Sequence, residues 1–237
     1  MGRRRSSRKK TLWSLLRRLL VTIGLCFLVI SITATLVLRW FDPPGSAFIW
    51  QSLFQGETAV HQWRPLSQIS QQLALMVIAA EDQRFPDHHG FDLAEIQNAV
   101  SDSIQGDRLR GASTITQQVA KNLFLWRSHS LPRKVLEAWF TIWIELFWSK
   151  QRILEVYLNV AEFGPNVYGA QAASSRYFKI AAKDLDRGQA ALMAAVLPNP
   201  RQFSLRRPSS YTRRRARAIL VLAERLGGTT YLERLHH

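Results

Sequence analysis

The sequence contains a single cysteine, Cys26, among 237 residues. One sulfur excludes an intramolecular disulfide and any zinc site that needs two or more cysteines. Acidic residues are also scarce, because 17 Asp and Glu stand against 32 Lys and Arg and leave a net charge of +15. With 47% apolar residues, 8 Trp and 12 Phe, the chain is too apolar and aromatic to be disordered. We therefore expect one main folded unit and an anionic partner.

Charged residues are absent from one long segment, 19–38, which reads LLVTIGLCFLVISITATLVL. At ~1.5 Å per residue, twenty helical residues span ~30 Å, the thickness of the hydrocarbon layer of a membrane. A cleaved signal peptide is the alternative, but its apolar part is usually about 7–15 residues long and precedes a small-residue cleavage site. This segment is longer and continues into Arg39 and Trp40. We predict an uncleaved transmembrane helix over 19–38.

Basic residues are unevenly distributed around this helix. Eight Lys and Arg lie before residue 19 without an acid, whereas Arg39 and Asp42 follow the helix. The positive-inside rule then places the tail, 1–18, in the cytoplasm and the rest of the chain outside it. A basic surface there does not normally meet nucleic acid, so we expect no nucleic-acid partner and favour anionic lipid or a phosphorylated substrate.

Sustained strand alternation is missing from the rest of the chain, and the apolar residues follow helical spacing. The turn cluster at 42–45 predicts a linker or membrane-proximal segment over 39–59, followed by a mainly α-helical domain over 60–237. Capping pairs predict three helix starts, Pro132 suits a first helical position, and two glycines suit helix ends. The capping pairs are Asp92 with Glu95, Thr114 with Gln117 and Asp186 with Gln189, and the glycines are Gly106 and Gly227.

One predicted helix, 135–148, is apolar on nearly every face. Glu137, Thr141 and Glu145 are spaced by four residues and form one narrow polar stripe. Such a helix lies either in the centre of a core or against lipid. Arg133 and Lys134 are within reach of Glu137 on the same face, which allows two readings. The group is either a salt-bridge cluster or a site for a phosphate or a phosphate-bound metal.

Glu81 ends another apolar helix, where a carboxylate is more often a solvated helix end than a catalyst. The segments 81–90, EDQRFPDHHG, and 110–118, RGASTITQQ, change this reading. Together they resemble the two leading motifs of the family 51 peptidoglycan glycosyltransferases. Further family blocks follow in order at 133–137, 152–159 and 190–200, so the resemblance covers roughly residues 60–230. Gln189 departs from the family pattern, in which Glu is frequent.

The resemblance implies a lysozyme-like helical glycosyltransferase domain with a smaller membrane-proximal lobe that contacts lipid. It also implies polymerisation of lipid II, in which the 4-hydroxyl of the acceptor N-acetylglucosamine attacks the donor sugar and displaces undecaprenyl diphosphate. The product link is β-1,4 with inversion. The resemblance is to the monofunctional members, the biosynthetic peptidoglycan transglycosylases, so we expect no transpeptidase activity. Such an enzyme lies in the bacterial inner membrane as a single-pass protein with a periplasmic catalytic domain.

The family pattern also implies roles for individual residues. Glu81 is expected to be the general base, and Glu137 with Arg133 and Lys134 the region that holds the diphosphate. A divalent metal, Mg or Mn, is expected there through the diphosphate, with no organic cofactor. The remaining residues implied to bind substrate are Asp82, Phe85, Gly111, Ser113, Thr114, Gln117, Gln118, Lys121 and Asn122. The expected partners are lipid II, the growing lipid-linked glycan strand, membrane lipid and other cell-wall synthesis or division proteins.

The second motif has its own physical reading. Gly111 permits a tight turn, and five polar side chains between 113 and 118 offer hydrogen-bond donors at a helix start, where a diphosphate or sugar hydroxyls can bind. Helix capping alone would need only Thr114 and Gln117. His88 and His89 could suggest a metal site, but neighbouring side chains on one loop rarely converge on one ion, so we favour a structural role for them.

Two other functions remain open at this level. A lysozyme-like lytic enzyme would share the fold and the catalytic Glu, but it typically has Ser directly after that Glu, where this chain has Asp82. A membrane scaffold without activity would need only the anchor and the basic helix predicted over 211–226, and it would not require the polar cluster at 113–118.

Overall fold

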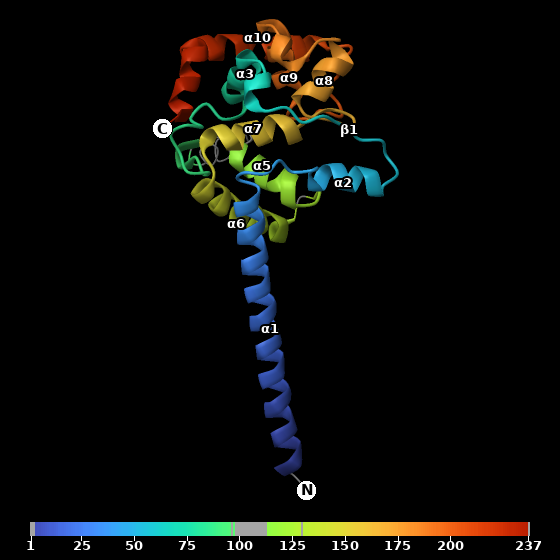
Figure 1. Ribbon diagram of the computed structural model, residues 1–237, viewed down its shortest axis with the longest axis vertical. Coiled ribbons are helices and arrows are strands. Elements are labelled where there is room, and N and C mark those ends of the chain that lie inside the picture. Colours follow the sequence, from blue (N-terminus) through green and yellow to red (C-terminus); the bar gives the residue numbers. More distant parts are fainter. Residues whose placement is uncertain (1–2, 96, 98–112, 129, 237) are drawn as a thin grey trace. The chain divides into compact units, whose positions relative to one another are not determined.

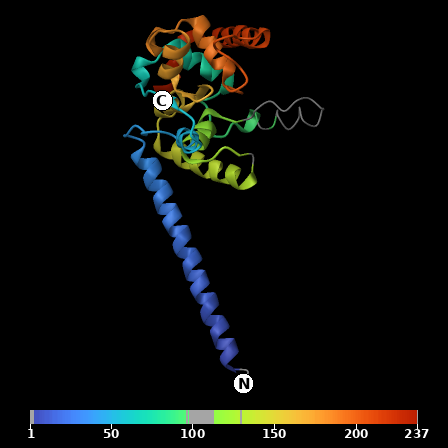
Figure 2. The same ribbon diagram turned by 90° about the vertical axis from the view of Figure 1, so that its right-hand side faces the viewer.

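The computed structural model describes residues 3–95, 97, 113–128 and 130–236 (Figures 1 and 2). The chain divides into two compact units, 1–41 and 42–237. The first unit consists mainly of helix α1 (Arg3–Val37), and within it Trp13–Val37 is long and apolar enough to cross a membrane. This helix begins well before residue 19 because Lys and Arg favour helix, so the basic tail continues the same helix.

The second unit is mainly α-helical, as predicted. Its helices pack in two groups joined by α7 (Figures 1 and 2): α3 packs with α9, α10 and η3, while α5 packs with α2, α6 and α7. The elements are α2 (Ala47–Phe54), β1 (Val60–His61), η1 (Leu66–Gln68), α3 (Gln71–Glu81), α5 (Ile115–Phe124), α6 (Leu131–Phe147), α7 (Lys150–Val160), β2 (Glu162–Gly164), β3 (Val167–Tyr168), α8 (Ala170–Tyr177), η2 (Ala182–Asp184), α9 (Arg187–Val196), α10 (Ser210–Arg225) and η3 (Gly228–His236).

Helix α3 lies in the centre of the core. All seven residues from Leu73 to Ala79 are buried, and no position on this stretch faces solvent. A helix that is apolar on every face has to be surrounded by other elements, which here are α9, α10 and η3. The last residue of α3, Glu81, therefore lies at the end of a helix that runs through the interior of the domain.

A small sheet packs against α8 and α9. Its strand order is β1-β3-β2, with β1 parallel to β3 and β2 antiparallel to β3. Val60 pairs with Val167, and Glu162 pairs with Tyr168. These strands have only two or three residues each, too few for an alternating pattern to be visible in the sequence.

Several predicted helix boundaries are confirmed. Thr114 with Gln117 and Asp186 with Gln189 each form a complete capping box, so Gln189 makes the hydrogen bond to the backbone that the motif requires at this position. Pro132 lies in the first turn of α6, and Gly227 follows α10 with φ +99°. The Asp92 carboxylate accepts hydrogen bonds from the backbone N–H groups of Ala94 and Glu95. Gly106 lies outside the described residues.

Candidate active site

Glu81 is not a solvated helix end. Its side chain is only 12% exposed, although it stands at the C-terminus of α3, where the helix dipole disfavours a negative charge. Burial raises the pKa of Glu81, and the hydrogen bond from Gln118 and the charges of Arg215 and Lys121 oppose this rise. A carboxyl group in such surroundings is suited to take up a proton.

The contacts of the Glu81 carboxylate differ between its two oxygens. The Gln118 side-chain amide donates a hydrogen bond of 3.0 Å to Oε2, whereas the Arg215 guanidinium lies 3.6 Å from Oε1. Among the described residues, only Gln118 donates a hydrogen bond to this carboxylate. Oε1 can therefore accept a proton from a substrate hydroxyl while Oε2 stays anchored.

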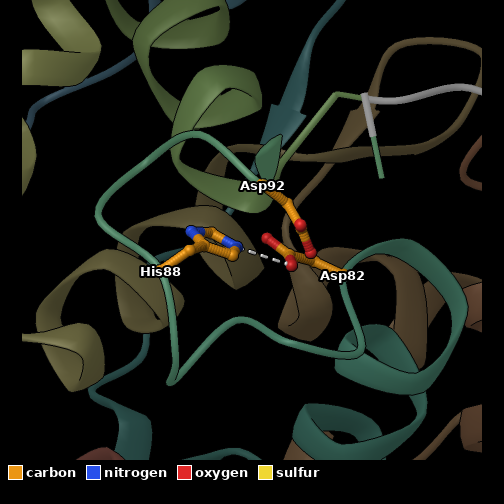
Figure 3. Close-up of side chains that lie close together, drawn as sticks. All are labelled: Asp82, His88 and Asp92. Atoms are coloured by element: carbon orange, nitrogen blue, oxygen red, sulfur yellow. Dashed lines mark hydrogen bonds and ion pairs between the residues drawn. The ribbon is translucent and has the colours of Figure 1, made fainter. Parts of the chain in front are cut away.

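The loop after Glu81 is held by Asp82, His88 and Asp92, whose nitrogen and oxygen atoms come within 4.8 Å of one another (Figure 3). His88 Nδ1 accepts a hydrogen bond from the Gly90 N–H, so its Nε2 carries the proton and donates to Asp82 at 2.8 Å. Asp82 also accepts from the Ile115 N–H at 2.9 Å. These bonds join the loop to the start of α5, which gives His88 and Asp82 a structural role.

The two neighbouring histidines have different environments. His88 is buried, whereas His89 is exposed, so their side chains do not converge on one point. This placement agrees with the structural interpretation from the sequence.

Three of the five polar side chains at 113–118 are directed into the protein. Thr114 donates to the Gly90 carbonyl at 2.7 Å and forms the capping box with Gln117. Thr116 donates to the Glu145 carboxylate and is fully buried. Capping and packing thus account for these three side chains. The other two differ: Gln118 donates to Glu81, whereas the Ser113 hydroxyl lies 3.5 Å from the Lys134 ammonium group. Gly111 lies outside the described residues.

Glu137 is the centre of a buried ionic group on α6. Its side chain is 3% exposed, and its two oxygens accept from different cations: Oε2 from Arg133 at 2.5 Å and Oε1 from Lys134. Arg133 is also buried, and its Nε has no acceptor among the described residues. The salt-bridge cluster predicted from the spacing is therefore present, and it keeps donors that an anion could engage.

Lys121 connects this group electrostatically to Glu81. Burial lowers the pKa of Lys121, Glu137 and Glu81 raise it, and Arg133 and Lys134 lower it. The ammonium group also lies 5.9 Å from the centre of the Phe48 ring. A cation that interacts with both glutamates can stabilise negative charge on either side of it.

Helix α6 has its polar stripe inside and apolar residues outside. Thr141 and Glu137 are buried, and Glu145 binds Lys150, which also donates to the His88 carbonyl at 2.6 Å. The sequence left open whether this helix lies in a core or against lipid, and the structure exposes four of its large apolar side chains. They are Leu131 (83% exposed), Val135 (69%), Ile142 (53%) and Leu146 (65%).

Other residues of the family blocks have structural roles. Phe85 is fully buried, with Lys150 4.7 Å from its ring centre, and Asn122 is buried on α5. Asn159 holds both backbone groups of Arg64 at 2.8 Å. The sequence analysis missed Arg215, because it lies in a run of four arginines, Arg213, Arg214, Arg215 and Arg217, in which nothing distinguishes it.

Comparison with known proteins identifies the family. Residues 50–224 match the transglycosylase family. A protein of Pseudomonas syringae pv. syringae (strain B728a) is 50% identical over 231 residues, which cover 95% of this chain and 98% of the relative. Proteins of Ectopseudomonas mendocina (strain ymp) and Xylella fastidiosa (strain M12) are 49% and 47% identical over 228 residues, covering 94% and 93% of each chain. All three are named biosynthetic peptidoglycan transglycosylase.

Proposed function

Because the chain belongs to the transglycosylase family, we propose that it polymerises peptidoglycan glycan strands from lipid II. The observation that supports this most directly is that two glutamates with little solvent exposure have different surroundings. Glu81 has one oxygen free of hydrogen bonds within the described structure, and Glu137 lies in a cationic group. An alcohol attacking an activated sugar needs both a base and a site for an anionic leaving group.

In the proposed reaction, the oxygen of the acceptor 4-hydroxyl attacks C1 of the donor sugar, and Glu81 Oε1 accepts the proton of that hydroxyl. The bond from C1 to the diphosphate breaks, and undecaprenyl diphosphate leaves with the electron pair. Attack opposite the leaving group inverts C1 and gives a β-1,4 link. Lys121, Arg133 and Lys134 are assigned to the negative charge that grows on the departing oxygens.

The residues around Glu137 do not fit a metal ion that this carboxylate would ligate directly. Both of its oxygens already accept from cations, and Lys121 adds a third positive charge nearby. Such a donor set suits an anion. In our proposal a divalent metal reaches the site only on the diphosphate oxygens, and the side chains meet the leaving-group charge themselves.

We further propose that the second unit contacts the lipid leaflet through the outward face of α6. Four large apolar side chains are exposed on this helix, more than a soluble surface normally shows on one element. Helix α1 is long and apolar enough for a single-pass membrane anchor, and its basic N-terminal residues support a cytoplasmic N-terminus. A lipid-linked substrate would then be reached without leaving the membrane.

The test is to incubate the purified full chain with labelled lipid II and to separate polymer from monomer. Glycan polymer from the wild type, and none from Glu81→Gln, is the expected result. Cleavage of preformed glycan strands without polymer synthesis would favour a lytic enzyme. Binding to lipid vesicles with neither activity would favour a scaffold, and either outcome would reject the proposed function.

A further inference from the structure

A chain of two hydrogen bonds connects the interior of the domain to Glu81. The Tyr157 hydroxyl donates to Gln118 Oε1 at 3.1 Å, and Gln118 Nε2 donates to Glu81 Oε2 at 3.0 Å. The three residues come from α7, α5 and α3, and Tyr157 is 1% exposed. None of the sequence motifs indicated a role for this tyrosine beyond membership of its block.

Chemistry fixes the direction of both bonds. An ionised carboxylate only accepts hydrogen bonds, so Gln118 has to turn its NH₂ group toward Glu81. Its oxygen then faces Tyr157, which has to donate. Burial raises the pKa of Tyr157 well above its ordinary value, and the charges of Glu81 and Asp82 add to this effect, so the hydroxyl keeps its proton. A flipped amide would place its oxygen against the Glu81 carboxylate and leave the Tyr157 proton without that acceptor.

We propose that Tyr157 is a positioning residue for the base Glu81, acting by fixing the orientation of the Gln118 amide. This inference rests on the proposed function. The anchored amide holds Oε2 and so aims Oε1 at the acceptor hydroxyl. Without the tyrosine hydroxyl, the amide oxygen loses a buried donor and the amide samples other orientations, in which Glu81 loses its hydrogen bond.

Other charges act on Glu81 independently of this chain of bonds. Arg215 approaches from α10, Lys121 from α5, and Asp82 follows directly in sequence. The substitution Tyr157→Phe removes one hydroxyl and leaves these three groups in place. A change in the pH dependence of the reaction would therefore report on the hydrogen bonds.

The experiment compares Tyr157→Phe with Tyr168→Phe in the full chain, using kcat, KM for lipid II and the pH profile of kcat/KM. Tyr168 is the matched control, because it is also fully buried and its hydroxyl is hydrogen bonded, 2.9 Å from the Ser52 hydroxyl, in the small sheet. We expect Tyr157→Phe to lower kcat by about 10-fold, the equivalent of one hydrogen bond, with KM nearly unchanged. Since the hydrogen bond from Gln118 lowers the pKa of Glu81, its loss raises that pKa. The acid limb, the part of the pH profile in which kcat/KM falls as the pH is lowered, then moves to higher pH. Tyr168→Phe should leave the acid limb in place.

Gln118→Met gives a second, independent measurement, because it removes the same hydrogen bond to Glu81. It should displace the acid limb as Tyr157→Phe does, and adding Tyr157→Phe to it should cause no further displacement. Two outcomes would overturn the positioning role. One is an acid limb that stays at the wild-type pH in either single variant, and the other is a double variant in which the displacements of the two single variants add. A wild type that makes no polymer from lipid II would instead reject the proposed function, and the role of Tyr157 with it.

Discussion

The substitution Glu137→Gln tests the stabilising role of the cationic group together with its proposed role in catalysis. It removes one charge with little change in volume. Arg133 then loses the carboxylate that pairs with it in the interior, where its side chain is only 9% exposed. Lys134 is 48% exposed and can return to water when the pair is broken. The consequence for stability should therefore come mainly from Arg133 and from the partly buried Lys121, which also loses the favourable charge of Glu137.

The magnitude follows from burial. Removing one partner of a buried ion pair typically costs about 3–5 kcal/mol, and the retained amide oxygen of Gln favours the lower value. A loss of about 3 kcal/mol corresponds to a fall in Tm of about 6–12 °C for a domain of this size. Polymerisation should fall as well, because an unpaired Arg133 is no longer held in place for the diphosphate.

The assay is thermal unfolding in detergent together with polymer yield from labelled lipid II. Lys134→Ala is the matched control, since a half-exposed ion pair contributes less than about 1 kcal/mol. Its Tm should change by no more than about 4 °C, while its turnover falls more than its affinity for substrate. A wild-type Tm in Glu137→Gln would refute the reasoning that this carboxylate neutralises a buried arginine.

Four further outcomes are expected. Glu81→Gln should lower polymer yield at least ~10²-fold, because it removes the proposed base. It should not lower Tm at neutral pH: the pKa of Glu81 is raised, so its ionised form destabilises the fold at neutral pH, and the neutral amide removes that charge. For the same reason the acid limb of wild-type kcat/KM should lie above the ordinary range of a glutamate, and a limb at or below that range would contradict the burial argument. Gly90→Ala should destabilise the chain by about 1–3 kcal/mol in denaturant unfolding, since Gly90 has φ +82° and an added Cβ would lie 2.6 Å from Thr141 Cγ2. EDTA should leave Tm unchanged, because no side chain is proposed to ligate a metal, and a lower Tm would place a structural metal in the chain.

Much of the helical architecture could be predicted because its signals are local. The capping pairs at 114–117 and 186–189 and the period of α3 each depend on residues within a few positions of one another. The three strands could not be predicted, because each is too short to show a period. β2 and β3 pair locally, but β1 pairs with β3 across more than a hundred positions, as Val60 with Val167 shows.

Which face of α6 is buried could not be predicted from its own residues. The sequence indicated one polar stripe, but the usual rule that apolar residues face inward would have turned Glu137 and Thr141 toward solvent. In the fold both are buried, because Arg133, Lys134 and the loop carrying Gly90 offer partners for that stripe. Arg133 and Lys134 are local partners that the spacing already indicated, but the loop carrying Gly90 reaches α6 only in the tertiary structure. The same is true of Arg215, which meets Glu81 from 134 positions away.

We propose Glu81 and not Glu137 as the base because of the partners that each carboxylate already has. A group that must accept a proton needs an oxygen that a substrate hydroxyl can approach. Both oxygens of Glu137 accept from cations, and proton transfer to either one would disrupt an ion pair that keeps Arg133 neutralised. Within the part of the chain that the structure describes, Glu81 accepts a hydrogen bond on one oxygen only, and Arg215 lies 3.6 Å from the other oxygen. If the roles were reversed, Glu81→Gln would retain the acid limb of the pH profile and Glu137→Gln would abolish it, and measuring both profiles decides the matter.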